Sequence, residues 1–261
     1  MPDWIDINCD MGESFGAYTI GRDEEVIRYV SSANIACGFH AADPTIMEKT
    51  VRLCRKHGVM TGAHPGYPDM RGFGRRSLDV SPEDLIHDVI YQVGALKGFL
   101  TLHDLPLQHV KLHGALYNDL VKQADLLLTL AGRIGKAFGN PIFLTLATTQ
   151  AIELKKKARR QGLRIALEGF PDRVYTDEGE LLSRKQPGAV LNDPDEIAAR
   201  AVRMVRKKGI ESVNGCWIDL DIDTLCIHGD NPESIEAAEK MVVRFAQENI
   251  QIKPLSELIG R

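Results

Sequence analysis

The chain has 261 residues, of which 44% are hydrophobic and 26% are charged. This is the composition of a globular protein that can bury a core, and it excludes a disordered chain and a coiled coil. With 32 Lys and Arg against 36 Asp and Glu, the net charge is -4, so the chain lacks the basic field that binds nucleic acid.

The first residues show no basic segment followed by an apolar stretch, and no run approaches the roughly 18 apolar residues of a membrane span. The five cysteines are odd in number and none is spaced as Cys-x-x-Cys, so we expect reduced thiols in a cytoplasmic protein. The length suits one α/β barrel, and we expect residues 1–261 to form a single domain.

Seven short apolar, β-branched segments alternate with longer helical patterns along the whole chain. This alternation predicts repeated strand and helix units around a parallel sheet, as in an α/β barrel. The predicted strands span residues 4–7, 33–38, 59–63, 109–112, 141–147, 164–167 and 224–227.

The predicted helices have recognisable starts and ends. A capping residue followed by proline predicts four starts, at Asp43-Pro44, Ser81-Pro82, Asp193-Pro194 and Asn231-Pro232. Gly58 and Gly209 follow basic residues and predict helix ends. We expect residues 169–192 and 214–223 to be long connections of the kind that line or cover a site.

Polar side chains follow the predicted strands at the end where catalytic groups gather in a parallel barrel. They are Asp10, His40, His64, His113, Glu168 and His228. Because four of the eight histidines fall there, this set is the strongest signal for a site. The remaining histidines are expected to be solvated or to cap helices, and they are His57, His87, His103 and His109.

Two chemistries suit this set, and spacing alone does not separate them. An aspartate with two or more imidazoles binds a divalent metal, which lowers the pKa of a bound water toward about 7. Without a metal, one carboxylate serves as general base and the imidazoles serve as acid and oxyanion partners.

Cationic residues occur near the same strand ends. Lys111 lies in a predicted strand two residues before His113, so both side chains point to one face, and we expect Lys111 to be buried and paired. A loop sets Arg71, Arg75 and Arg76 among glycines, which suits binding of a carboxylate or phosphate, although a plain surface loop is the alternative. The glycine patterns of a P-loop and of a Rossmann nucleotide site are absent from the sequence.

Around these residues the sequence resembles the LamB/YcsF family. The matching segments follow one another along the chain at residues 6–13, 32–40, 62–69, 72–76, 113–118, 168–173 and 227–230. The chain departs from the family pattern at Cys9, Ala42, Leu112 and Pro171, none of which is a polar residue at a strand end.

The resemblance implies a seven-stranded TIM-like barrel similar to those of the glycoside hydrolase/deacetylase superfamily. It also implies a hydrolase that opens the lactam of 5-oxoproline to L-glutamate, with ATP as co-substrate. Two further 5-oxoprolinase subunits, B and C, would be its partners. In that superfamily an aspartate and two histidines bind a metal, and the matching positions are Asp10, His64 and His113.

These arguments give a candidate site, with Asp10 activating water and Lys111 stabilising developing charge. The expected catalytic residues are Asp10, His40, His64, Lys111, His113, Glu168 and His228. The residues expected to bind substrate or phosphate are Arg71, Arg75, Arg76, Asn118 and Arg173. Two alternatives stay open: a metal-dependent deacetylase or amidohydrolase that acts alone, and a non-catalytic subunit that binds substrate.

Overall fold

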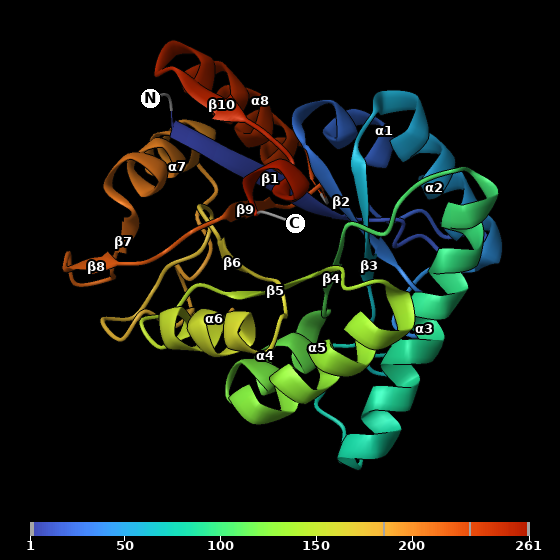
Figure 1. Ribbon diagram of the computed structural model, residues 1–261. Coiled ribbons are helices and arrows are strands. Elements are labelled where there is room, and N and C mark those ends of the chain that lie inside the picture. Colours follow the sequence, from blue (N-terminus) through green and yellow to red (C-terminus); the bar gives the residue numbers. More distant parts are fainter. Residues whose placement is uncertain (1–2, 185, 230, 260–261) are drawn as a thin grey trace.

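Seven parallel strands form a closed barrel that is surrounded by helices (Figure 1). The computed structural model describes residues 3–184, 186–229 and 231–259. Each strand pairs with the next along the chain, and the last closes the ring by pairing with the first. The barrel strands are β1 (Asp3–Met11), β2 (Ser32–Ala36), β3 (Met60–His64), β4 (His109–Lys111), β5 (Ile142–Leu146), β6 (Ile165–Gly169) and β9 (Thr224–Ile227). The predicted seven-stranded α/β barrel is confirmed.

Strand β1 is longer than the sequence predicts. Its first residues pair with a short strand that was not predicted from the sequence. Asp3 to Ile5 pair with β10 (Ile250–Ile252), while the following residues pair with β9 and β2. The predicted strand stopped before Asn8 because polar residues alternate with apolar ones in this segment. Asp10 therefore lies within β1 and not after it.

The interior of the barrel is polar, which explains that alternation. Ile5, Ile7, Cys9 and Met11 belong to the buried apolar core. The alternate residues of β1 point into the barrel, where Asn8 Nδ2 donates to Thr224 Oγ1 at 2.8 Å. An interior built from such hydrogen bonds replaces the layers of branched apolar side chains that usually fill an α/β barrel.

Ten helical segments surround the strands in the described part of the chain (Figure 1). The longer ones are α2 (Pro44–His57), α3 (Pro82–Leu102), α4 (Gly114–Val121), α5 (Ala124–Phe138), α6 (Ala151–Arg160), α7 (Pro194–Lys207) and α8 (Pro232–Gln247). The short ones are α1 (Asp23–Val26), the 3-10 helix η1 (Ile27–Tyr29) and α9 (Leu255–Leu258). None of the helices described is long and apolar enough to cross a membrane.

The four predicted helix starts are confirmed by their caps. The side chains of Asp43, Ser81, Asp193 and Asn231 each accept a hydrogen bond from a backbone N–H of the first turn. These bonds satisfy donors that have no partner inside the helix. Gly58 ends α2 in the left-handed conformation, at φ 67°, as predicted.

The end of α7 differs from the prediction. Lys208, at φ 50°, takes the left-handed position that was expected of Gly209. Gly209 instead begins β7 (Gly209–Glu211), which pairs with β8 (Trp217–Asp219) in an antiparallel hairpin. A side chain at Gly209 would collide with the carbonyl oxygen of Ile218, 2.3 Å from the Cβ position, so close strand pairing explains the glycine.

After Gly169, which ends β6, the described residues of the predicted connection 169–192 form no helix or regular strand, yet the segment folds upon itself. Isolated bridges join Arg173 to Val190 and Tyr175 to Leu181. Tyr175 is fully buried, and its hydroxyl accepts a hydrogen bond from the backbone N–H of Phe170 at 2.9 Å. This segment, called the β6–α7 loop below, is therefore anchored over the barrel end.

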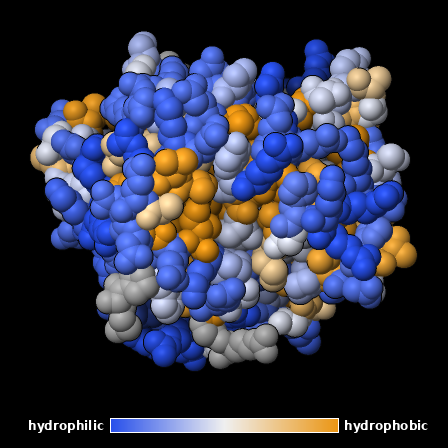
Figure 2. Space-filling view, turned by 90° about the horizontal axis from the view of Figure 1, so that it is seen from above, coloured by the Kyte–Doolittle hydropathy of each residue, from blue (hydrophilic) through white to orange (hydrophobic). Residues whose placement is uncertain are grey.

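The surface is mixed in character. Figure 2 shows one face on which hydrophilic atoms dominate and apolar side chains gather in separate patches. Large apolar side chains that are exposed include Tyr18 and Tyr91. Such scattered exposure is ordinary for a folded protein.

Candidate functional site

A cavity of about 840 Å³ opens at the carboxyl ends of the barrel strands. Its wall comes from strand ends, from helix α4 and from the loops after β1, β3, β4, β6 and β9. The expected catalytic residues that line it are Asp10, His64, Lys111, His113 and His228. His40 and Glu168 are fully buried next to them. The topology therefore brings all seven expected residues to one end of the barrel.

The floor of the cavity is a buried ion-pair network around Lys111. Its ammonium Nζ lies 3.0 Å from Asp10 Oδ1 and 2.8 Å from Glu168 Oε1. Burial lowers the pKa of Lys111, but the two carboxylates outweigh burial and hold it well above its ordinary value. Burial likewise raises the pKa of Asp10, but His64 and Lys111 bring it well below the usual range. At neutral pH Lys111 is therefore a cation and Asp10 an anion.

Further polar groups fix the two carboxylates of this network. The hydroxyl of Tyr117, on α4, donates to Glu168 Oε2 at 3.0 Å, and Asn34 Nδ2 donates to Asp10 Oδ1 at 2.8 Å. Glu168 lies inside β6, not after it, so its side chain points into the barrel. These bonds leave Asp10 Oδ2 as the oxygen turned toward the histidines, 3.3 Å from His64 Nε2.

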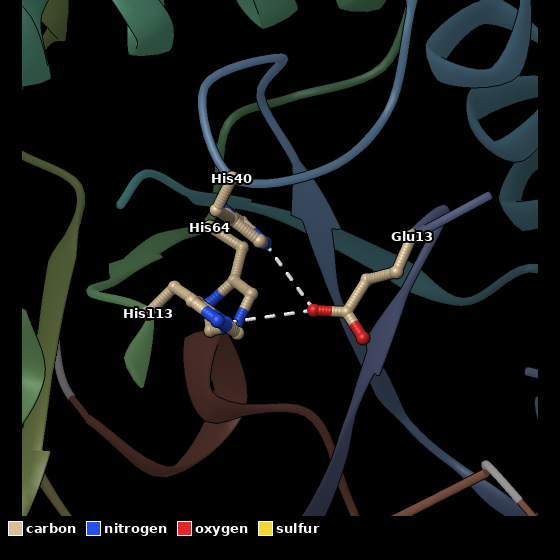
Figure 3. Close-up of side chains that lie close together, drawn as sticks. All are labelled: Glu13, His40, His64 and His113. Atoms are coloured by element: carbon tan, nitrogen blue, oxygen red, sulfur yellow. Dashed lines mark hydrogen bonds and ion pairs between the residues drawn. The ribbon is translucent and has the colours of Figure 1, made fainter. Parts of the chain in front are cut away.

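Three histidines and one glutamate form a compact cluster (Figure 3), and Glu13, His64 and His113 of this cluster line the cavity. Glu13 Oε1 lies 3.2 Å from His40 Nε2 and 3.4 Å from His113 Nδ1. His64 Nε2 lies 3.0 Å from the same His113 nitrogen. One ligand atom from each residue lies within 4.8 Å of every other, and we call these four residues the Glu/His cluster.

Backbone carbonyls determine where two of these rings carry their protons. His64 Nδ1 is 2.9 Å from the carbonyl oxygen of Lys111, and His113 Nε2 is 2.8 Å from that of Phe73. A carbonyl oxygen only accepts, so each of these nitrogens carries a hydrogen. The opposite nitrogens, His64 Nε2 and His113 Nδ1, then face each other as lone pairs unless a cation or an extra proton lies between them.

Glu13 and His40, the other two members of the cluster, add further electron-rich atoms beside His64 Nε2 and His113 Nδ1. Burial and the neighbouring imidazoles lower the pKa of His40 and of His113 well below the ordinary value, so both rings are neutral at pH 7. The ring atom of His40 that faces the cluster is Nε2, which lies beside the carboxyl group of Glu13. Imidazole nitrogens with one carboxylate form a donor set that suits a divalent transition metal. The residues present therefore fit such an ion.

A second group lies across the barrel, beside β6 and β9. His228 Nδ1 donates to Asp172 Oδ2 at 2.7 Å, and the guanidinium of Arg184 donates to His228 Nε2 at 2.9 Å. Burial lowers the pKa of His228, but Asp172 outweighs it and the net direction is upward. Asp172 thus orients the imidazole and favours its protonated form, whereas Arg184, which donates to Nε2, opposes it.

The residues expected to bind substrate or phosphate divide into two groups. Arg75, Asn118 and Arg173 line the cavity. The guanidinium of Arg75 lies 5.1 Å above the ring of Phe73, and Arg173 donates to two backbone carbonyls of the β6–α7 loop.

Arg71 and Arg76 lie elsewhere. Arg71 is exposed and, like Arg76, is absent from the described lining of the cavity. Arg76 forms an ion pair with Asp69 in its own loop, which fixes the loop instead of leaving the guanidinium free for a ligand.

Sequence reasoning missed Glu13, Tyr117 and Asp172. Glu13 follows the end of β1 through Gly12, whose φ of 70° turns the chain back over the cavity. A glycine directly before a glutamate at a strand end was the available signal. Tyr117 and Asp172 lie in segments that matched the family, but neither spacing nor residue type singled them out.

The expectation for His109 is wrong. This histidine is fully buried in β4, and its Nε2 lies 2.7 Å from the side-chain oxygen of Asn34. Burial lowers its pKa to about 3, so the ring is neutral and belongs to the polar barrel interior. His57 and His87 are exposed, as expected. Asp230, at the end of the last matching segment, lies outside the described residues.

Known proteins resemble this chain over nearly its full length. The pattern of the LamB/YcsF family matches residues 5–260. A Pyrococcus furiosus protein, named as the A subunit of 5-oxoprolinase, is 47% identical over 255 residues, which are 98% of this chain and 99% of that protein. A protein of the same name from Campylobacter jejuni subsp. doylei is 44% identical, with the same coverage.

A solved structure shows the same likeness. The crystal structure of a lactam utilization protein from Thermus thermophilus matches this chain with a TM-score of 0.87 and 41% sequence identity. The match covers 95% of this chain and 98% of that one. The likeness in fold therefore extends over nearly the whole chain.

Proposed function

The chain belongs to the LamB/YcsF family, and from this membership and the cavity we propose that it is the A subunit of an ATP-dependent 5-oxoprolinase. It would open the lactam of 5-oxoproline to L-glutamate together with B and C subunits. The observation that carries the proposal is the 47% identity over 98% of the chain to a protein of that name. The unpaired cysteines, four of them buried, suit a reducing cytoplasm.

The chemistry of the substrate explains the need for ATP. A five-membered lactam is a resonance-stabilised amide with a poor leaving group, so water attacks it slowly. Transfer of a phosphoryl group to the amide oxygen would make the carbonyl carbon more electrophilic. We assign the hydrolytic step to this chain, because its cavity holds carboxylates, a lysine and imidazoles at one barrel end.

Three residues have environments that suit the steps of that hydrolysis. Asp10 is ionised and turns Oδ2 to the cavity, so it would accept the proton of the attacking water. Lys111, 3.0 Å from Asp10, would stabilise the negative charge that develops on the carbonyl oxygen. His228, whose pKa Asp172 raises, would carry a proton at Nε2 and pass it to the leaving nitrogen once Arg184 no longer donates to that atom.

The Glu/His cluster would hold a divalent metal through Glu13, His40, His64 and His113. When bound, such an ion supplies Lewis acidity at the carbonyl oxygen and lowers the pKa of a coordinated water. The chain's own contribution is to fix two of the four donors by hydrogen bonds to backbone carbonyls.

The decisive experiment measures ATP-dependent glutamate release by the chain reconstituted with B and C subunits. Asp10→Asn keeps the side-chain volume and should lower turnover by at least about 100-fold, as expected for loss of a general base. Circular dichroism and thermal unfolding should show an intact fold. Wild-type turnover in this variant, with substrate still bound, would instead indicate a subunit that only binds and presents substrate.

A second function is favoured by the Glu/His cluster itself. A chain that holds a divalent metal beside a general base could hydrolyse an amide such as an N-acetyl sugar without ATP or partners. Assay of the isolated chain on N-acetylated sugars, with and without added zinc or manganese, separates the two functions. Activity without ATP or partners would favour the deacetylase or amidohydrolase.

A further inference from the structure

The cavity is electrically uneven from one side to the other. On the side of β1 to β4, the Glu/His cluster and Asp10 present carboxylates and neutral imidazoles. On the side of the β6–α7 loop, the cavity wall carries the guanidinium groups of Arg173 and Arg184 and the single carboxylate of Glu180. A substrate with one anionic end and one amide therefore has a preferred orientation, with its anionic end toward the loop.

Arg173 is poorly placed to bind that anionic end. It is only 7% exposed, and its Nε and Nη2 atoms donate to the carbonyl oxygens of Ala189 and Leu182. These bonds span the β6–α7 loop and hold it together. The role of Arg173 is thus to stabilise the loop that carries Arg184.

Arg184 has the properties of a ligand-binding arginine. Its side chain is exposed, and its guanidinium donates to a ring nitrogen of His228, not to a carboxylate. Among the described residues no carboxylate lies within ion-pair distance of it, although Asp172, on the other side of His228, is close enough for Arg184 to lower its pKa. Space lies on both of its sides, because Arg184 lines the main cavity and also a smaller one of about 130 Å³.

The other cations of the cavity are less suited to the same task. Lys111 is held between two carboxylates. Arg75 lies over the ring of Phe73, on the acidic side of the cavity. Burial raises the pKa of Glu13, and Arg75 is close enough to that carboxyl group to oppose the rise.

We propose that Arg184 is the specificity-determining residue that binds the carboxylate of the lactam substrate. This inference rests on the proposed function and extends it. A planar guanidinium binds a carboxylate through two parallel hydrogen bonds. The contact with His228 places the guanidinium at the cavity wall, and when the guanidinium binds the carboxylate instead, His228 Nε2 beside it becomes free to carry a proton.

The test compares two lactams that differ in one group. 5-Oxo-L-proline carries the carboxylate, whereas 2-pyrrolidinone has the same ring without it. Isothermal titration calorimetry measures binding of each to the full chain and to its Arg184→Ala, Arg184→Lys and Arg159→Ala variants. Arg159, on α6, is exposed and serves as the matched control.

We expect Arg184→Ala to weaken binding of 5-oxo-L-proline by about 10- to 100-fold, the usual effect of losing a charged hydrogen-bonding partner. The affinity for 2-pyrrolidinone should not change. The affinity of Arg184→Lys for 5-oxo-L-proline should lie between those of the wild type and Arg184→Ala. Arg159→Ala should bind both lactams as the wild type does. Thermal unfolding should be unchanged in all variants.

The possible failures are distinguishable. If the wild type binds 5-oxo-L-proline more tightly than 2-pyrrolidinone and Arg184→Ala shows the same difference in affinity, the role of Arg184 is overturned. The proposed function then still stands. A wild-type chain that binds the two lactams equally well also overturns it. If the wild type binds neither lactam, alone or in the complex with B and C subunits, the proposed function falls together with this inference.

Discussion

The Glu/His cluster shows how hydrogen bonds to the main chain can prepare a site for a cation. In His64 and in His113, one ring nitrogen donates a hydrogen bond to a backbone carbonyl oxygen, at 2.9 and 2.8 Å. The other nitrogen of each ring is then an acceptor, and these two acceptors face each other. Two lone pairs 3.0 Å apart repel each other unless a proton or a metal ion separates them. Either a shared proton or a bound metal ion can occupy this position, and the carboxyl group of Glu13, 3.4 Å from His113 Nδ1, favours a cation there.

We therefore predict that the purified chain binds about one divalent metal ion with this cluster. Glu13→Gln and His40→Ala should each weaken metal binding by more than about 10-fold, because even outer-shell changes cost about 10- to 100-fold. Inductively coupled plasma mass spectrometry of dialysed protein measures the metal content. His57→Ala, an exposed histidine on α2, is the control. Equal metal content in wild type and Glu13→Gln would contradict the prediction.

At the residue scale, the sequence predicts which polar groups meet but not how they are paired. The strand-end rule identified His64, His113 and His228 because parallel strands bring their carboxyl ends together. It did not reveal Glu13, whose position depends on the backbone turn at Gly12. It also misjudged His109, because a polar barrel interior cannot be distinguished from a surface by residue type alone.

At the scale of elements, the helix starts show how one side chain joins two parts of the chain. Asp43 caps α2 by accepting from the backbone N–H groups of Thr45 and Ile46, at 2.8 and 3.0 Å. Its second carboxylate oxygen accepts from the N–H of Gly16, in the loop after β1. These backbone donors hold the pKa of Asp43 below its ordinary value. The cap thus also fixes the loop that carries Glu13.

Asp43→Ala should lower the free energy of unfolding by about 1 kcal/mol, the usual cost of losing a cap. Because the folded-state pKa is depressed, this contribution is present above the ordinary pKa of aspartate and is lost as the pH falls below it. Urea unfolding at pH 7 and pH 3.5 measures both effects. Asp43→Asn keeps a capping oxygen and should retain most of the stability at pH 7. An unchanged stability in Asp43→Ala would refute the argument.

The sequence predicted elements well where their pattern was local. Caps followed by proline located four helices, and β-branched runs located all seven barrel strands. β10 and the β7–β8 hairpin were missed because each has only three residues and depends on a partner distant in sequence or on a tight turn. Asp10 and Glu168 were placed after their strands because polar residues were read as strand ends.

At the scale of the whole molecule, the polar interior links strands that are not neighbours in the barrel. Lys111, on β4, reaches Asp10 on β1, Glu168 on β6 and the thiol of Cys226 on β9. Below it, Asp6 accepts from Ser32 at 2.6 Å, and burial raises the pKa of Asp6 to about 6. The floor of the cavity and the closure of the barrel therefore depend on the same hydrogen bonds.

This dependence predicts a large effect of Lys111→Met, which keeps the length of the side chain and removes its charge. The variant leaves two buried carboxylates without their cation, so the free energy of unfolding at pH 7 should fall by about 3–5 kcal/mol. Removal of Lys111 shifts the pKa of Asp10 upward, because one of the two groups that oppose the effect of burial is lost while His64 remains. The loss of stability should therefore become smaller as the pH falls from 7 to 5, because the folded variant takes up a proton on Asp10 more readily than the wild type does. Urea unfolding at both pH values measures the difference.

Two further variants decide whether unpaired charge causes the loss. Lys111→Met combined with Glu168→Gln removes one of the two stranded carboxylates, so it should regain part of the stability at pH 7 and should fold even if the single variant does not. Lys56→Met, on the exposed side of α2, should stay within about 0.5 kcal/mol of the wild type. If the double variant were no more stable than Lys111→Met, lost packing and not charge would govern the barrel interior. The cavity floor would then owe its stability to shape, and its ion pairs would serve catalysis alone.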